Sequence, residues 1–183
     1  MDAGVDTSVT RASGLTDRLE EADPWFAIWT RSRHEKAVRD QLSRKRVEAF
    51  LPTIERWSRW QDRRKKIDWP LFPGYCFVRF ARESRLRVLK CSGVVGIVSF
   101  NGEPATIPAH EIESIRRLIA TDLRYDPCPL LSEGTMVEVE HGPLKGVVGR
   151  LIRKGRHARL VLAVNLIGQG VSVEVDAADI KVY

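Results

Sequence analysis

The residues with the clearest potential chemistry are the cations and tryptophans of stretch 56–66, RWSRWQDRRKK. Arginine and lysine contact phosphates, and a tryptophan ring can stack on an exposed base for about 1–3 kcal/mol. The nucleic-acid contacts predicted here are Arg56, Trp57, Arg59, Trp60, Arg63, Arg64, Lys65 and Lys66. An alternative of about equal weight packs both tryptophans beneath a hairpin and leaves the charges solvated.

The sequence offers few groups for catalysis or metal binding. The four histidines, His34, His110, His141 and His157, are scattered, and His34–Glu35 has no second histidine at helical spacing. No P-loop, GxSxG or glycine-rich dinucleotide motif is present. The three cysteines, Cys76, Cys91 and Cys128, form no CxxC pair. We therefore expect no enzyme activity, catalytic residue, metal or cofactor.

The positive charge is concentrated in one part of the chain. Residues 31–90 hold 18 Lys/Arg against 7 Asp/Glu, whereas residues 1–24 hold 2 against 6. This asymmetry predicts that the first folded domain approaches a polyanion. Without a signal-peptide core or a run of about 18 apolar residues, we expect a cytoplasmic protein with reduced thiols and no membrane contact.

The stretch Trp69–Phe80, WPLFPGYCFVRF, follows the cations directly and has the pattern of a buried strand. Pro70, Pro73 and Gly74 predict a fixed bend at its start. Phe72 lies inside this bend, so its side chain could project from the sheet edge, where a partner would have to cover it. On local evidence alone, a core strand preceded by a solvated turn is the favoured interpretation.

Other patterns predict the elements that position these residues. Strands are expected at 25–30, 49–57 and 94–100, the last closed by Asn101–Gly102. Helices are expected from a Ser32 cap to about Val47, over 83–91 with Leu86 and Leu89 inward, and after Pro108 with a stripe of Ile112, Ile115, Leu118 and Ile119. The order βαββαβα predicts an α+β sheet covered by helices.

The chain divides by composition into four parts. Residues 1–23 are expected to be a disordered acidic tail, 24–122 the first domain, and 123–132 a linker that contains two prolines. Residues 133–183 change to an all-β pattern. Short strands are expected at 136–139, 147–152, 160–164, 171–175 and 180–182, which predicts a small barrel.

These motifs together resemble the NusG family of transcription elongation factors over about residues 24–183. WFAIWT, RSRHEKAV, LFPGYCFVRF and GVVGIVSFNGEPATIP occur in the order of the family's NGN domain, and VEVEHGPLKGVVG is similar to a KOW motif. The resemblance implies an α+β protein. It would have an NGN-type mixed sheet covered by helices, followed by a small five-stranded SH3-like β-barrel, the KOW domain.

The resemblance also implies partners. The NGN domain of the family grips the clamp helices of RNA polymerase, and the matching positions here are Trp25, Phe26, Phe72 and Tyr75. DNA near the transcription bubble would contact the basic tract, residues 56–66. The KOW domain of the family binds Rho or NusE, with Leu144, Ile167 and Gln169 as the expected contacts. A monomer is expected.

Three departures favour a specialised paralogue. Leu144 stands where phenylalanine is usual. The loop 165–169 lacks the Phe-Gly-Arg that is usual in the general factor, and its Asn-Leu-Ile portion, 165–167, is similar to RfaH. The stretch RRKKIDWPLFPGY is similar to specialised antiterminators, which are RfaH-like or UpxY-like. The predicted function is therefore elongation and antitermination by suppression of pausing or termination. The alternatives are a general NusG that also acts with Rho, and a ribosome-associated KOW protein that binds RNA.

Overall fold

The computed structural model describes residues 23–60, 63–129, 134–154 and 157–182. Side chains are not described for 58–60, 63–65, 153–154 and 157. The expected tail, residues 1–23, lies outside the described residues except for Asp23. Within the described part of the chain, no helix is both long and apolar enough to cross a membrane.

The first sheet is built around β1 (Trp25–Thr30), which has the predicted bounds. Its order is β2-β5-β1-β6, with β2 (Glu48–Phe50), β5 (Tyr75–Arg79) and β6 (Val94–Ile97), and β9 (Thr106–Ile107) also pairs with β1. All pairings are antiparallel. Since side chains alternate along a strand, Phe26 and Ile28 occupy one face while Trp25, Ala27 and Trp29 occupy the other.

Two helices cover the Phe26 face. The first, α1 (Glu35–Arg44), buries Val38 and Leu42 against Phe26 and Ile28. The expected Ser32 cap is wrong. The backbone of Arg33 turns at φ 61°, so the helix begins after His34, and the Ser32 carbonyl instead lies 2.9 Å from His34 Nδ1.

The second helix, α2 (Arg85–Leu89), is shorter than expected because residues 82–84 form a 3-10 turn. The inward residue is Val88, whereas Leu86 is 65% exposed. One turn of α-helix presents only a single position to the core, so the expected pair of inward leucines is wrong for Leu86.

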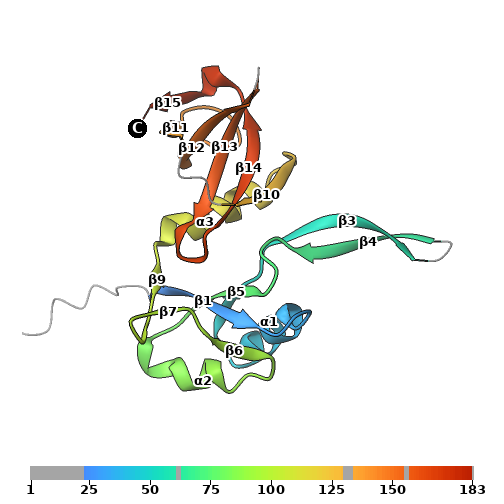
Figure 1. Cartoon of the computed structure of the whole chain (residues 1–183), viewed down its shortest axis with the longest axis vertical. Coiled ribbons are helices and arrows are strands. Elements are labelled where there is room, and N and C mark those ends of the chain that lie inside the picture. The colour runs from blue at the N-terminus through green and yellow to red at the C-terminus, as the bar shows by residue number, and fades with distance from the viewer. Residues whose placement is uncertain (1–22, 61–62, 130–133, 155–156, 183) are drawn as a thin grey trace, which may run out of the picture.

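A two-stranded ribbon, β3 (Thr53–Trp60) with β4 (Arg63–Pro70), extends away from both sheets (Figure 1). The expected strand 49–57 is thus divided between β2 and β3, with Pro52 at the break. The expected single strand Trp69–Phe80 is also divided. Its first two residues belong to β4, residues 71–74 form a turn, and β5 begins at Tyr75.

The expected turn at Asn101–Gly102 is confirmed. It joins β7 (Ser99–Phe100) to β8 (Glu103–Pro104), and both turn residues have positive φ, 51° and 84°. Such angles at both central positions are those of a tight hairpin turn, for which Asn-Gly is the favoured pair. The helix expected after Pro108 is α3 (Ala109–Ile119), with Ile112, Ile115 and Leu118 buried.

The second sheet contains the five expected strands and a sixth. They are β11 (Thr135–Val139), β12 (Val148–Lys154), β13 (His157–Val164), β14 (Gln169–Val175) and β15 (Ile180–Val182), with β10 (Tyr125–Pro129) added from the expected linker. Two 3-10 turns, Asn165–Ile167 and Ala177–Asp179, lie between strands.

The expected closed five-stranded barrel is not found. The order is β10-β14-β13-β12-β11-β15, with an open edge at each end among the described strands. Tyr125–Pro129 was expected to link two domains, but it pairs with β14 over its whole length. The two prolines in β10 suit this position, because an edge strand can lack amide donors on its outer side.

The two sheets share one hydrophobic core, and α3 lies between them (Figure 1). Trp25, Ala27 and Phe77 contribute from the first sheet, and α3 adds its three buried apolar residues. The second sheet contributes Val137, Val139, Leu160, Leu162, Val164, Val171 and Val173. The Trp25 face of the first sheet is therefore covered in part by α3 and the second sheet.

Candidate functional site

Three of the four aromatic residues expected to bind polymerase are buried. Trp25 and Phe26 lie on opposite faces of β1, and Phe72 is 1% exposed. The guanidinium carbon of Arg116 lies 5.1 Å from the ring centre of Trp25, which helps to cover that side chain. Only Tyr75 retains partial exposure.

The expectation that Phe72 projects from the sheet edge is wrong. The turn folds it inward, since Leu71 N donates to Pro52 O at 2.8 Å and Tyr75 N donates to Phe72 O at 3.1 Å. The Phe72 ring then packs edge-to-face on Phe77, with 5.6 Å between the ring centres. Phe72 therefore packs in the core with Trp25 and Phe77 and is not exposed at the sheet edge.

On the Trp25 face of the first sheet, the exposed aromatic side chain is Trp29, which contacts Tyr75. Trp29 is 52% exposed, and its ring centre lies 6.0 Å from that of Tyr75 in an edge-to-face arrangement. On the other side of Trp29, its strand partner is Gly96, where an added Cβ would meet nothing within 4 Å. The aromatic pair is thus flanked by open space.

The turn that carries Tyr75 is held from two sides. Gly74 N donates to the Glu35 carboxylate at 2.9 Å, and Thr30 N donates to Gly74 O at 2.9 Å. Gly74 has φ 84°, a value that favours glycine because it has no Cβ. Glu35, a buried residue in the first turn of α1, therefore couples this helix to the turn before Tyr75.

The basic tract is divided between the two sides of the ribbon. Trp57 pairs with Lys66 and Arg59 with Arg64, whereas Arg56 pairs with Ile67 and Trp60 with Arg63. Successive positions of a strand alternate between its two faces, so Trp57 and Lys66 lie on one side of the ribbon and Arg56 lies on the other. The eight nucleic-acid contacts therefore stay a prediction.

The described side chains show how the side of the ribbon that carries Trp57 and Lys66 is arranged. Trp57 is exposed, with Lys66 Nζ 5.6 Å from its ring centre, and Lys66 also forms an ion pair with Glu55 at 2.9 Å. Trp57 is therefore not packed beneath the hairpin, so the alternative interpretation of the tract is wrong for this residue. The side chains of Arg59, Trp60, Arg63, Arg64 and Lys65 lie outside the described residues.

The expected partner contacts of the second sheet differ in exposure. Leu144 is 2% exposed and belongs to the shared core, so it offers no surface in this arrangement. Ile167 and Gln169 are half-buried, and Ile167 packs against the same core. Gly142 and Gly146, with φ 83° and 79°, allow the chain to turn Leu144 inward.

Polar contacts between α3 and the second sheet were not predicted from the sequence. The Asn165 backbone N and Nδ2 donate to the two carboxylate oxygens of Glu111, at 3.2 and 2.6 Å. Arg117 Nη1 donates to Lys145 O at 3.2 Å. Because Glu111 and Asn165 are 54 residues apart, no local motif could have indicated this pair.

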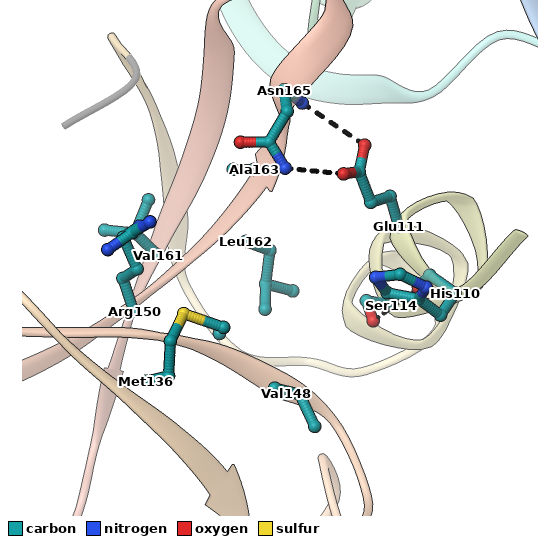
Figure 2. A pocket seen from close by; sticks show the side chains of 11 residues that line it. His110, Glu111, Ser114, Met136, Val148, Arg150, Val161, Leu162, Ala163 and Asn165 are labelled. Carbon is teal, nitrogen blue, oxygen red and sulfur yellow. Dashed lines mark hydrogen bonds between the residues drawn. The ribbon is translucent and has the colours of Figure 1, made fainter. Parts of the chain in front are cut away.

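A small cavity of about 110 Å³ lies beside this contact (Figure 2). His110, Glu111 and Ser114 line it from α3, and Met136, Arg150 and Leu162 are among its residues from the second sheet. Figure 2 shows both Asn165–Glu111 hydrogen bonds at its rim. The cavity is too small for a nucleotide, and it forms part of the packing between α3 and the second sheet.

The titratable groups with altered pKa values are not arranged for catalysis. Burial raises the pKa of Cys76 to about 12, with a smaller opposing effect from Arg39. Burial also raises the pKa of Tyr125 and of Cys128. These thiols stay protonated at neutral pH, which disfavours nucleophilic roles. Among the described residues, no three His, Cys, Asp or Glu side chains are grouped as metal ligands would be.

The structure is similar to a solved structure described as "Domain interaction in Thermotoga maritima NusG", with a TM-score of 0.52. Identity is 22%, and the match covers 87% of this chain and 96% of the other, so the likeness concerns the fold alone. A structure described as the MjSpt4:Spt5 complex matches at 17% identity over 87% of this chain and 97% of the other. Its TM-score of 0.28 supports no inference.

A sequence model provides the assignment of family. The model described as "Transcription termination factor nusG" matches residues 23–116, just over half of the chain. The matched range begins before β1 and ends within α3, so it includes the whole first sheet, the ribbon and the aromatic pair. The chain therefore belongs to the NusG family of transcription factors.

Proposed function

We propose that this transcription factor binds the clamp helices of RNA polymerase through the face of its NGN domain that carries Trp29 and Tyr75. The observation that carries the proposal is the aromatic pair, exposed at the uncovered end of β1 and β5. Large aromatic side chains that sit on a rigid sheet and remain in water are typical anchors of protein interfaces. An apolar stripe on a helix is a suitable counterpart.

The buried aromatic residues would give this surface its rigidity. Phe72 and Trp25 lie in the core beneath the same face, and Glu35 fixes the Gly74 turn. A preorganised surface loses less conformational entropy on binding than a mobile one. In this proposal Trp29 takes the role that the sequence assigned to Trp25 and Phe26.

The consequence of binding would be antitermination. A factor that binds the closed clamp more tightly than the open clamp shifts the population toward the closed, elongating state. The ribbon would meanwhile contact DNA near the transcription bubble. No enzymatic step is required, and NusG-family transcription factors are non-enzymatic.

The second sheet is proposed to be the KOW domain and to recruit a further partner. Leu144 is buried, so a contact with NusE or Rho would have to use residues such as Ile167 and Gln169, or require this sheet to separate from α3. Burial of Leu144 hinders both partners alike. The preference for a specialised RfaH-like or UpxY-like paralogue over a general NusG, and the doubt about Rho binding, come from the three departures in the sequence.

The test is transcription by purified bacterial RNA polymerase on a template with a pause site, an intrinsic terminator and a Rho-dependent terminator. The proposal expects shorter pauses and more read-through when the protein is added, without enhancement of Rho. Enhanced termination by Rho would indicate the general factor instead. Copurification with ribosomal RNA in place of polymerase subunits would indicate the ribosome-associated alternative.

A further inference from the structure

The strand β6 contains a bulge beside the exposed aromatic pair. Gly96 lies opposite Trp29 on β1. The next pair along the two strands is Val94 with Thr30, because the register shifts at this point. Val95 is therefore an extra residue with no partner of its own on β1, and it is 62% exposed. Bulges re-aim side chains and often lie next to functional sites, so this irregularity suggests a use beyond strand pairing.

The fold does not require glycine at position 96. The φ of Gly96 is outside the left-handed region, and a Cβ added there would meet no atom within 4 Å. Gly149 and Gly170 of the second sheet differ, since an added Cβ would come within 2.8 and 2.9 Å of a carbonyl oxygen. Glycine also weakens the interior of a strand, because it loses more conformational entropy and packs no side chain. Stability alone therefore does not account for a glycine opposite Trp29.

The end of β1 carries a further cost in stability. Thr30 is 8% exposed, and its Oγ1 has no hydrogen-bond partner among the described residues. A buried hydroxyl without a partner destabilises a fold. The glycine, the exposed valine and this hydroxyl thus occur together where β6 shifts its register on β1. Local rules of stability are typically broken together at functional sites.

Gly96 leaves a notch on the face of the sheet that carries Trp29. Directly opposed residues of antiparallel strands point to the same face, with their Cβ atoms about 5 Å apart. The flank of Trp29 toward β6 therefore has no side chain beside it, whereas Tyr75 contacts Trp29 from β5. Because β6 is the last strand in the described order of this sheet, the notch is open outward. Its walls are an aromatic ring and backbone, which suit a single large apolar side chain.

We propose that this notch receives one large apolar side chain, such as leucine, methionine or phenylalanine, from the helix that binds the Trp29 face. Gly96 is then a specificity-determining residue, since a larger residue at position 96 would exclude that side chain. Exclusion by size is a common source of specificity at interfaces. The inference rests on the proposed polymerase surface and adds to it the chemistry of the partner's contact residue.

The experiment measures the affinity of core RNA polymerase for a size series at position 96, with thermal melting of each variant. Gly96→Ala should weaken binding about threefold and Gly96→Val about tenfold, because the added volume fills the notch. Neither change should lower the melting temperature, since there is room for a Cβ and both residues lose less conformational entropy than glycine. The matched control is Thr106→Ile, which adds apolar volume at an exposed position of β9 in the same sheet and should bind normally.

Trp29→Ala in the same assay separates this inference from the proposed function. If Trp29→Ala weakens binding while both Gly96 variants bind and melt normally, the notch is not used, although the polymerase surface stands. If neither Trp29→Ala nor its double variant with Tyr75→Ala has an effect, polymerase binds elsewhere and both proposals are wrong. Normal affinity of Gly96→Ala with a lowered melting temperature of Gly96→Val would make Gly96 a structural residue. Tighter binding by Gly96→Val would show that the partner has no side chain inserted here.

Discussion

Gly74 N donates a hydrogen bond to the carboxylate of Glu35 at 2.9 Å, and this bond joins the first turn of α1 to the turn that presents Tyr75. Its partners are 39 residues apart in the sequence. The bond connects the RSRHEKAV and LFPGYCFVRF motifs of the sequence. It gives one physical reason why the two motifs occur together.

Removing this acceptor should affect both stability and binding. Glu35→Ala leaves a partly buried amide unpaired, which should lower the free energy of unfolding by about 1–3 kcal/mol. Polymerase affinity should also fall, because the turn before Tyr75 loses one of its two fixed points. Glu35→Gln keeps an acceptor oxygen and should lose less in both measurements. If the two variants lost equal stability and equal polymerase affinity, the hydrogen bond to Gly74 N would not be the cause of either loss.

Phe72→Ala should behave as a core substitution. The side chain is 1% exposed and packs on Phe77, so its removal should lower the free energy of unfolding by about 3–5 kcal/mol. Chemical denaturation measures this directly. If the variant had normal stability but did not bind polymerase, Phe72 would be an exposed polymerase contact, as the sequence suggested, and not a core residue.

The Glu111–Asn165 contact should hold α3 against the second sheet. Asn165→Ala removes the shorter of the two hydrogen bonds to a buried carboxylate, so separation of the sheet from α3 should become easier. Small-angle X-ray scattering should then show a larger radius of gyration than for the unaltered chain. An unchanged radius, even with Arg117→Ala added, would indicate that the apolar core alone maintains the arrangement.

Burial of Cys76 should make stability fall in alkaline solution. Its pKa is raised from 9.0 to about 12, so between these values the thiol ionises in the unfolded chain but not in the folded one. This contribution is fully present below pH 9 and is lost as the pH rises through about 12, with a slope of up to about 1.4 kcal/mol per pH unit.

Comparison with Cys76→Ala isolates this effect from other groups that titrate in the same range. The variant should be less stable at pH 7 because it leaves a small cavity, and the difference should shrink as the pH rises above 9. A difference that stays constant from pH 8 to 11 would show that the thiol ionises equally in both states.

The alternation of apolar residues was enough to predict much of the fold. WFAIWT gave β1 with its bounds, and the stripe of Ile112, Ile115 and Leu118 gave the buried face of α3. The same alternation contained the signal for Trp29, which shares a face with Trp25 and lies nearer the open end of the strand. The resemblance to the family's first strand points to Trp25 and Phe26 instead, and alternation alone does not show which end of β1 stays uncovered.

Other features depend on contacts between distant segments. The inward position of Phe72 follows from a hydrogen bond between Leu71 and Pro52, and the strand β10 exists because β14 supplies its partner. Two prolines in Tyr125–Pro129 suggested a linker, since local propensity cannot show that the outer edge of this strand is unpaired.

The most direct test of the account is the affinity of RNA polymerase for Trp29→Ala. The chain and its variants would be titrated against core polymerase in a fluorescence or interferometry assay, with thermal melting to confirm folding. Loss of an exposed interface anchor should weaken binding by about 2 kcal/mol, or about 30-fold, without lowering the melting temperature. Phe100→Ala, which removes an aromatic side chain that is 73% exposed elsewhere on the NGN domain, should bind normally. Unchanged affinity for Trp29→Ala and for the double variant with Tyr75→Ala would contradict the proposed polymerase surface.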